Sequence, residues 1–298
     1  MLEVVNYSFK YGENLVLEDI SFSLGKGKIL GIIGPSGCGK TSLVKAIVGL
    51  YESNESNIRL FGKQVYDNPE IKRNIAYVPD EQPSFYLITI KEIVNFYKSI
   101  YSSFSEERFY KINKVFKIPL NKRFMQLSKG MKMRVSIMIA FSLDASLLVL
   151  DEPTSGLDPI LKKAVLNLVR EEVSSGEKSA IITSHNLRDL EEVCDEILII
   201  NNGKVDYYNT LNNMKENIKK IQVAFDKPIY EEDLACQGII TIDNVGRVFT
   251  IITEKYDDKF IKSLQQYEPL FIEEIDLNLE EIFIYKLGKE KEYEKIFK

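Results

Sequence analysis

Short apolar stretches separated by glycine and charged residues fill the first part of the chain and predict strands. Apolar and polar positions alternate over residues 2–7 and 20–24, and residues 29–33 are almost continuously apolar. Residues 58–61 and 75–78 continue this pattern. Alternation with a period of two is typical of strands, so the N-terminal part is expected to be rich in β-structure.

The apolar period changes to about 3.6 residues between residues 84 and 142, which predicts a mainly helical insert. Ile90 and Ile93 lie on the apolar face of one expected helix, and Pro119 limits the next one. A last helix opens at Ser128, whose hydroxyl can accept a hydrogen bond from a free backbone amide of the first turn. By itself this segment indicates only a capped amphipathic helix.

Two apolar segments, residues 147–150 and 179–183, predict central strands of a parallel sheet that is covered on both faces. The first is followed by Asp151 and Glu152, and the second leads to His185, the only histidine in the sequence. Taken alone, the acids could simply face water, and a lone histidine is more often structural. In open α/β sheets, however, ligands bind outside the carboxyl ends of the strands, so these side chains are candidates for one shared site.

A glycine-rich segment stands between the expected strand at 29–33 and an apolar stretch of helical spacing at 42–49. It matches the GxxxxGK[ST] pattern, in which loop amides and a helix N-terminus hold phosphates. Lys40 is expected to reach the β- and γ-phosphates, and Thr41 to bind Mg²⁺ through its hydroxyl. The predicted nucleotide-binding residues are Gly34, Pro35, Ser36, Gly37, Cys38, Gly39, Lys40, Thr41 and Ser42.

The pattern near the C-terminus predicts a second, smaller α+β domain, which divides the chain at 1–216 and 217–298. The expected order is strand, helix, two strands, helix and strand, at about 221–225, 230–236, 239–242, 248–252, 258–267 and 270–275. This βαββαβ order suggests a ferredoxin-like fold, and a closing helix is expected at 279–286. The segment carries no glycine loop or paired acids, which favours a dimerisation or packing role.

The composition of the 298 residues is that of a globular protein, with 45% hydrophobic and 28% charged residues. A net charge of −5 gives no electrostatic footprint for binding nucleic acid. The cysteines Cys38, Cys194 and Cys236 have neither disulfide-framework nor zinc-ligand spacing, and we interpret them as reduced, cytosolic thiols. No apolar run approaches the roughly 18 residues of a membrane-spanning helix, and the start of the chain lacks the pattern of a secretory leader.

The glycine loop, the segment at 127–131, the acidic strand end, the turn at Asp158 and the strand-end His185 occur in an order that resembles the ATP-binding subunit of an ABC transporter. The resemblance covers about residues 1–216. It implies an α/β fold, the P-loop NTPase of ABC type, with a central mainly parallel sheet, an N-terminal antiparallel β-subdomain and a helical subdomain at about 84–142. The cofactors that it implies are ATP and Mg²⁺.

By position, the resemblance assigns residues 34–41 to the Walker A loop and 147–151 to the Walker B strand. Asp151 would hold Mg²⁺ directly or through water. Glu152 matches the catalytic base, which polarises the water that attacks the γ-phosphate. His185 matches the switch histidine, which contacts the γ-phosphate and helps to hold the catalytic geometry.

Further nucleotide contacts are implied at two places outside the Walker motifs. Tyr11 matches the aromatic residue that stacks on adenine, and Val16 lies where a small apolar residue packs beside the sugar. The family's signature motif covers the γ-phosphate held by the opposite subunit, and it matches Ser128, Lys129, Gly130 and Met131. Asp158 matches the acid of the D-loop, which runs across the dimer interface, although its turn could also be a plain helix start.

Two departures distinguish the sequence from the usual family pattern. The signature usually reads Leu-Ser-Gly-Gly-Gln, whereas Lys129 and Met131 occupy its third and fifth positions here. Asp80 occupies the position of the Q-loop glutamine, and we interpret it as a further candidate Mg²⁺ ligand, acting through water, beside Thr41 and Asp151. Both departures resemble an exporter-like branch of the family that works with separate, small permeases.

The aromatic segment Phe85, Tyr86 and Leu87 follows the region in which family members meet the membrane subunit. An exposed cluster there would suit a groove that receives a short permease helix. The same side chains could instead pack the core of the helical insert, and the sequence does not separate the two roles.

The resemblance implies an ATP-hydrolysing subunit that forms a homo- or heterodimer around two ATP molecules and drives a separate membrane permease, in the direction of export. Such a subunit works in the cytoplasm, on the inner face of the cell membrane. The alternative is a soluble ABC-type ATPase that acts on ribosomes or nucleic acid, but this chain has neither a second ATPase unit nor a long coiled-coil insertion. A P-loop kinase would not need residues 127–131 or His185.

Overall fold

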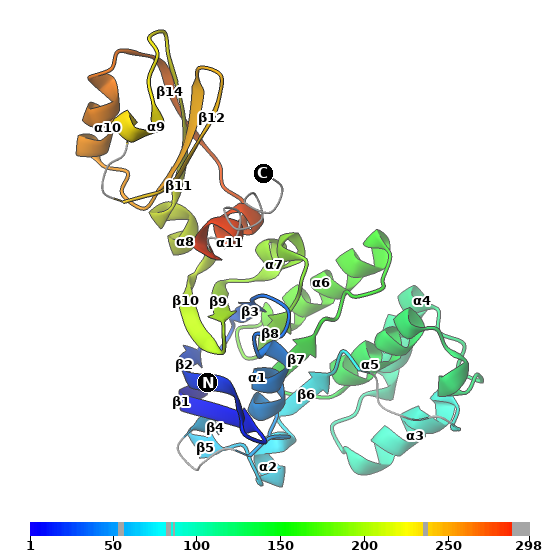
Figure 1. Cartoon of the computed structure of the whole chain (residues 1–298). Coiled ribbons are helices and arrows are strands. Elements are labelled where there is room, and N and C mark those ends of the chain that lie inside the picture. The colour runs from blue at the N-terminus through cyan, green and yellow to red at the C-terminus, as the bar shows by residue number, and fades with distance from the viewer. Residues whose placement is uncertain (53–56, 82–84, 86, 235–237, 288–298) are drawn as a thin grey trace. The chain divides into compact units, whose positions relative to one another are not determined.

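The structure is a computed structural model that describes residues 1–52, 57–81, 85, 87–234 and 238–287 (Figure 1). The chain forms two compact units, Met1–Tyr208 and Asn209–Lys298. The second unit begins before helix α8 (Leu211–Asn217), whereas the sequence pattern put the boundary at 216, because the strand signal resumes only after this helix. Within the described part of the chain, no helix is both long and apolar enough to cross a membrane.

A six-stranded sheet, in the order β10-β9-β3-β8-β7-β6, forms the centre of the first unit. Its strands are β3 (Ile29–Ile33), β6 (Ile75–Val78), β7 (Leu147–Asp151), β8 (Ser179–Thr183), β9 (Glu196–Asn201) and β10 (Lys204–Thr210). The pairs β3–β8, β3–β9, β6–β7 and β7–β8 are parallel. Every residue of β3, β7 and β8 is buried, as expected for strands covered on both faces. The carboxyl ends of these three strands therefore lie side by side.

A smaller antiparallel sheet, in the order β2-β1-β4-β5, forms the predicted N-terminal β-subdomain. Its strands are β1 (Leu2–Tyr11), β2 (Asn14–Leu24), β4 (Ile58–Leu60) and β5 (Lys63–Gln64), followed by the short helix α2 (Pro69–Lys72). β1 and β2 are longer than the sequence pattern predicted, because register shifts between Val4 and Lys10 interrupt the alternation of apolar and polar positions. Apolar residues of this sheet share one core with helix α1 (Lys40–Ile47) and the central strands.

The helical insert is confirmed, and each of its main helices has a polar side chain at its N-cap. The helices are α3 (Ile90–Ile100), α4 (Glu106–Phe116), the short 3₁₀ helix η1 (Phe124–Gln126) and α5 (Lys129–Ser142). The side chains of Thr89, Ser105 and Ser128 accept hydrogen bonds from backbone amides in the first turns of α3, α4 and α5. Helix α4 ends at Lys117, whose backbone is left-handed (φ 54), before Pro119.

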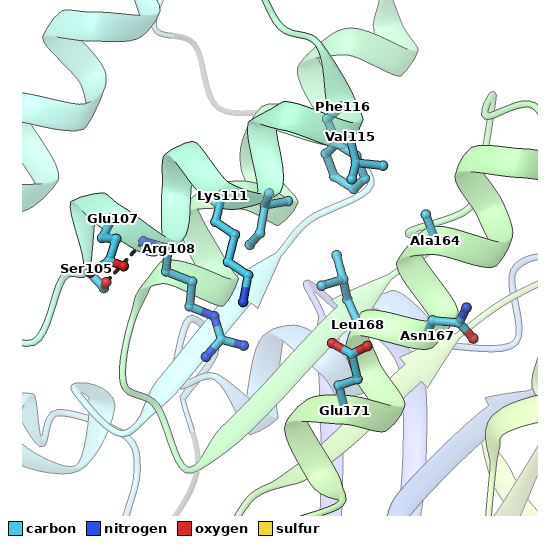
Figure 2. A pocket seen from close by; sticks show the side chains of 11 residues that line it. Ser105, Glu107, Arg108, Lys111, Val115, Phe116, Ala164, Asn167, Leu168 and Glu171 are labelled. Atoms are coloured by element: carbon cyan, nitrogen blue, oxygen red, sulfur yellow. Dashed lines mark hydrogen bonds between the residues drawn. The ribbon is translucent and has the colours of Figure 1, made fainter.

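The buried carboxylate of Glu172 links the insert to the rest of the unit. Glu172 lies on helix α6 (Pro159–Val173), and strand β8 and helix α7 (Leu187–Val193) follow α6 along the chain. Arg108 of α4 forms an ion pair with one oxygen of Glu172, and Lys178 Nζ lies 2.6 Å from the other. A cleft of about 540 Å³ separates α4 from α6 here, with Lys111 and Glu171 among the residues that line it (Figure 2). None of the predicted site residues lines this cleft.

The second unit is built on an antiparallel sheet in the order β12-β13-β11-β14. Its elements after α8 are β11 (Lys219–Phe225), α9 (Glu231–Leu234), β12 (Ile239–Val245), β13 (Val248–Thr253), α10 (Asp258–Gln265), β14 (Pro269–Ile275) and α11 (Leu279–Leu287). Leu234 of α9 and Phe260 and Leu264 of α10 pack in one core with β11 and β13. The βαββαβ order and this strand arrangement agree with the expected ferredoxin-like fold.

Candidate functional site

The carboxyl ends of β3, β8 and β7 bring the glycine loop, the two acids and the histidine together, as the sequence predicted. They surround a cleft of about 250 Å³. All of the residues that line it were predicted from the sequence: Val16, Ser36, Gly37, Gly39, Lys40, Thr41, Ser42, Asp80, Asp151, Glu152 and His185.

The glycine loop takes a conformation that side chains would block. A Cβ atom at Gly34 would lie 2.2 Å from the carbonyl oxygen of Ile200, and one at Gly39 would lie 2.6 Å from Leu17 Cδ2. Gly39 is also the N-cap of α1, with φ 107 and no side-chain cap, so the first amides of the helix are left for an anion. Lys40 Nζ, which is nearly buried, donates to the carbonyl oxygens of Gly34 (2.8 Å) and Pro35 (3.0 Å). The loop therefore holds its own lysine beside the position expected for the phosphates.

The two neighbouring acids are turned apart by the backbone of Glu152, which is left-handed (φ 52). Thr183 on the adjacent strand fixes both acids, because it lies in register with Asp151. Its hydroxyl donates to Asp151 Oδ1 and accepts a hydrogen bond from the backbone amide of Glu152 at 3.0 Å. Residues with such φ values are uncommon and concentrate at functional sites.

Burial raises the pKa of both carboxyl groups. For Asp151, hydrogen bonds from Thr183 and Thr41 oppose this effect of burial, while the charge of Asp80 adds to it. For Glu152, burial again has the largest effect on the pKa, and His185 opposes it. A cation beside these acids would favour their ionised forms.

The donor set at Asp151 fits a hard cation such as Mg²⁺. Asp151 Oδ2 is buried and has no hydrogen-bond partner among the described residues, although burying such an oxygen unsatisfied is costly. The side chain of Thr41 lines the same cleft and lies near enough to this carboxyl group to lower its pKa. Carboxylate and hydroxyl oxygens suit Mg²⁺, which binds through one or two protein groups together with substrate phosphates and water. No group of three or more histidine, cysteine or acidic side chains that could hold a metal ion occurs in the described ranges.

His185 lies directly against Glu152. Its Nε2 is 3.3 Å from Glu152 Oε1, and its backbone amide donates to Glu152 Oε2 at 3.2 Å. The imidazole side chain is 60% exposed, so it faces the open cleft rather than the core. This position disfavours a purely structural role for the histidine.

The signature residues are placed differently, because Ser128, Lys129, Gly130 and Met131 do not line the cleft of their own chain. The Ser128 hydroxyl accepts from the Met131 amide (3.3 Å), which confirms the expected N-cap. A Cβ atom at Gly130 would lie 2.8 Å from the carbonyl oxygen of Gly156. The N-terminus of α5 thus packs closely on the turn that follows β7.

Asp158 and Tyr11, two other predicted site residues, do not line the cleft. The side chain of Asp158 caps α6, accepting from the amides of Ile160 (3.0 Å) and Leu161 (3.1 Å). This is the plain helix start that the sequence left open, and the role of Asp158 in a dimer stays a prediction. Tyr11 is 71% exposed at the end of β1, and it does not line the cleft.

Cys38 and Cys194 do not line the cleft. Both are buried cysteines that form no disulfide, and Cys236 lies outside the described residues. Burial raises the pKa of the Cys194 thiol far above its usual value, which disfavours reactivity.

Two features of the site were missed by the sequence analysis. One is Thr183, which a register argument for two parallel strands of equal length could have placed opposite Asp151. The other is an ion pair between Asp80 and Lys129, whose charged atoms are 3.4 Å apart. No local pattern predicts this pair, because its two residues come from distant parts of the sequence.

Within the aromatic segment at 85–87, the structure describes Phe85 and Leu87, and the docking of a permease there stays a prediction. Phe85 packs edge-to-face against Phe96, Tyr97 and Phe124, with ring centroids 6.0 to 6.4 Å apart, so it belongs to the core of the insert. Leu87 is 71% exposed, and Tyr86 lies outside the described residues.

Comparison with known proteins identifies the family. The family model for ABC transporters matches residues 17–155, and a model described as an AAA domain, putative AbiEii toxin, Type IV TA system, matches residues 123–188. The ABC transporter ATP-binding protein YtrB of Bacillus subtilis is 32% identical over 295 residues, with 98% of this chain and 100% of the relative covered. The ABC-type transporter ATP-binding protein EcsA of the same organism is 31% identical over 76% of this chain and 94% of its own length.

Solved structures agree with these relatives. A structure of the ATP-binding subunit of an ABC transporter superposes with a TM-score of 0.67 and 31% identity, over 72% of this chain and 92% of that one. A dimeric ATP-binding cassette in a post-hydrolysis state, bound to ADP and phosphate, shares the fold with a TM-score of 0.62 and 22% identity, over 71% of this chain and 99% of that one. Since the cleft carries the chemistry of this family and a relative matches along the whole chain, the protein belongs to the ATP-binding subunits of ABC transporters.

Proposed function

We propose that this ATPase binds MgATP in the described cleft, closes with a second subunit around two ATP molecules, and drives a separate membrane permease in the direction of export. The observation that carries the proposal is the contact of Glu152 with His185 beside the glycine loop. A buried carboxylate and an imidazole at this position can act on a water molecule next to a bound γ-phosphate.

Different residues of this chain bind the phosphates, accept the proton from water and orient the catalytic carboxylate. Lys40 and the uncapped amides of α1 bind the phosphates and offset their negative charge. Glu152 accepts a proton from the attacking water, and its left-handed backbone aims the carboxylate away from Asp151. His185 donates its backbone amide to Glu152 and thereby holds that carboxylate in one orientation. Its exposed ring is free to contact the γ-phosphate.

Asp151 and Thr41 are the residues that would hold Mg²⁺, and Asp80, which lines the same cleft, would contact the cation through water. When bound, the cation neutralises charge on the phosphates. Thr183 keeps Asp151 Oδ1 occupied by a hydrogen bond, which leaves Oδ2 as the oxygen that would hold the cation.

The second subunit completes the site. Ser128 and Gly130 stand at the N-terminus of α5, where an anion is favoured, yet they lie outside the cleft of their own chain. A second copy, or a homologous subunit, would present this helix end to the bound γ-phosphate. The dimeric post-hydrolysis structure of a protein with the same fold supports this arrangement.

The export direction is inferred from relatives and from the signature sequence. One relative, 32% identical over 69% of this chain and 68% of its own length, is the linearmycin resistance ATP-binding protein LnrL of Bacillus subtilis.

Exposed apolar side chains on the insert, Leu87, Phe96, Ile100 and Met125, offer a surface for a permease helix. The chain would then work on the cytoplasmic face of the membrane.

Glu152→Gln tests the catalytic assignment. The amide cannot accept the proton, so ATP turnover is expected to fall by roughly 10²- to 10⁴-fold, while ATP binding is retained and an ATP-bound dimer accumulates. Turnover, nucleotide affinity and light scattering measure the three effects. Glu81→Gln removes the same charge from an exposed neighbour of the site and should behave like the wild type. Hydrolysis near the wild-type rate in Glu152→Gln would remove this residue from the role of base.

Leu87→Asp tests the permease surface. The variant should keep its ATPase activity and lose the multi-span membrane protein that we expect to co-purify with the wild type. Leu50→Asp, at a comparably exposed leucine outside the insert, is the matched control and should retain that partner. Equal co-purification with both variants would contradict docking at Leu87.

A further inference from the structure

The Asp80–Lys129 ion pair joins the cleft to the signature segment within one chain. Asp80 follows β6 and lines the cleft. Lys129 is the first residue of α5, and its Nζ lies 3.4 Å from Asp80 Oδ1. The two residues stand at two of the three positions where this sequence departs from the usual family motifs, and each charge meets an opposite charge that the usual glutamine and glycine would not provide.

Helix stability alone does not account for a lysine at this position. A cation in the first turn interacts unfavourably with the helix dipole, and the first turn of α5 contains no acidic residue that would offset it. The carboxylate of Asp80 supplies the missing negative charge from another segment. Lys129 is therefore positioned by Asp80 rather than by its own helix.

The pair also balances charge at the cleft. Asp80, Asp151 and Glu152 all line it, whereas Lys40 is the only lysine or arginine among the described residues of its lining. Lys129 adds a second cation from outside. Binding of a cation and phosphates would change the charge around both residues of the ion pair. Asp80 lines the cleft in which the cation would bind, and Lys129 belongs to the signature segment, which is expected to contact phosphate.

The exposure of the two side chains makes the contact easy to exchange. Lys129 is 65% exposed and Asp80 is 40% exposed, and ion pairs of this kind shift an equilibrium by only about two- to fivefold. Salt screens them further. The Asp80–Lys129 ion pair can therefore favour one position of the start of α5 and still be broken when a ligand that carries several charges binds.

We propose that Asp80 positions Lys129, and with it the start of α5, in the nucleotide-free subunit, and that Lys129 exchanges Asp80 for the phosphates held by the partner subunit when the dimer closes. The proposal rests on the proposed function for its second half. Gly130 makes the exchange a movement of more than one side chain, since its close contact with Gly156 ties the helix end to the turn after β7.

The first half is tested on the full-length protein without nucleotide. Amide hydrogen exchange of Lys132 and Met133 in the first turns of α5 is measured at low salt in Asp80→Asn, Lys129→Gln and the double variant. Each single variant should exchange about two- to fivefold faster than the wild type, and the double variant no faster than either. Glu81→Gln is the control and should match the wild type. Additive effects, or equal rates in all variants, would overturn the pairing.

The second half is tested by the ATP concentration at which the Glu152→Gln protein dimerises. Asp80→Asn releases Lys129 and also removes the proposed water-mediated contact of Asp80 with the cation, so it is added both to Glu152→Gln and to Glu152→Gln with Lys129→Gln. Relative to its effect in the Lys129→Gln background, Asp80→Asn should lower the midpoint by about two- to fivefold when Lys129 is present. An equal change of the midpoint in both backgrounds overturns the exchange.

The two experiments fail in different ways. If Glu152→Gln does not dimerise with ATP at all, the proposed function fails, while the exchange rates without nucleotide still decide whether Asp80 positions Lys129. If dimerisation occurs and Asp80→Asn changes the midpoint equally with and without Lys129, the proposed function stands and the exchange of partners is wrong.

Discussion

The nucleotide cleft and the signature segment are built by different means, although both are expected to contact the same phosphates. Groups in the cleft stand at the ends of fully buried parallel strands, and backbone atoms or buried hydrogen bonds fix them. The signature residues stand at one exposed helix end, fixed by an N-cap, a close glycine contact and an exchangeable ion pair.

The difference shows what each half of the site has to do. The cleft must hold reacting groups within a few tenths of an ångström before the substrate arrives, and a rigid sheet edge provides this. The signature segment must leave one partner and meet another, and a strongly held contact would oppose that movement. Four sets of substitutions can break or sharpen this comparison.

Glycine substitutions should have the largest effect on stability and should separate the two regions. Gly34→Ala places a Cβ 2.2 Å from the backbone of the central strand β9, which cannot shift easily, so we expect a loss of about 3 kcal/mol in the free energy of unfolding. Gly130→Ala approaches a turn at 2.8 Å, and a loss of about 1–2 kcal/mol is expected because the turn can yield. Gly37→Ala, with no atom within 4 Å of its Cβ, is the control for loop strain alone. Denaturant unfolding measures all three, and equal losses at Gly34 and Gly130 would contradict the difference in rigidity.

Removing the cation of the glycine loop should have the next largest effect. In Lys40→Ala the phosphates lose a buried charged donor, so ATP affinity is expected to fall by roughly 10²-fold. Lys45→Ala, on the same helix but outside the cleft, should bind ATP normally. Calorimetric titration of both variants with MgATP measures the effect, and unchanged affinity in Lys40→Ala would overturn the loop assignment.

The buried carboxyl group of Asp151 should lower the free energy of unfolding of the protein without nucleotide. Burial raises the pKa of Asp151, so the folded protein holds this proton more tightly than the unfolded chain does. The resulting stability is complete below the unfolded pKa of about 3.9 and is lost as the pH rises through the folded pKa. Asp151→Asn should therefore be more stable than the wild type at pH 7 by roughly 1–2 kcal/mol, and the gain should shrink towards pH 4. Unfolding at several pH values checks this, and a gain independent of pH would contradict it.

Two matched N-caps give the smallest effect. Ser128→Ala and Ser105→Ala each remove a hydroxyl that caps a helix of the insert, and each should cost about 1 kcal/mol in the free energy of unfolding. Only Ser128→Ala should also raise the ATP concentration needed for dimerisation, because only this serine belongs to the signature. If both variants dimerise alike, Ser128 is a cap and nothing more.

The sequence predicted the cleft well because its residues are local to strand ends. Strand, glycine loop and helix occur in one continuous stretch, and the acids and the histidine directly follow buried strands, so parallel pairing alone brings them together. Their order also carried the family resemblance. Thr183 escaped notice because its role depends on the register between β7 and β8, which the sequence does not state.

The signature side was less predictable for a physical reason. Local pattern predicted the N-cap at Ser128, but the ion pair of Lys129 depends on how the insert folds back on β6. Phe85 shows the same limit, since only the fold reveals that its ring packs among other aromatic rings while Leu87 stays exposed. Contacts that form only when distant segments fold together cannot be predicted from the periodicity of one segment.

The buried carboxylate of Glu172 has a kinematic consequence for the insert. Arg108 and Lys178 share it, one from α4 and one from the segment before β8, and the carboxylate is only 4% exposed. Leaving this buried carboxylate without Arg108 would cost more than opening the exposed pair at Lys129. A movement of the insert that keeps this pair intact must therefore leave the first turn of α4 beside Glu172.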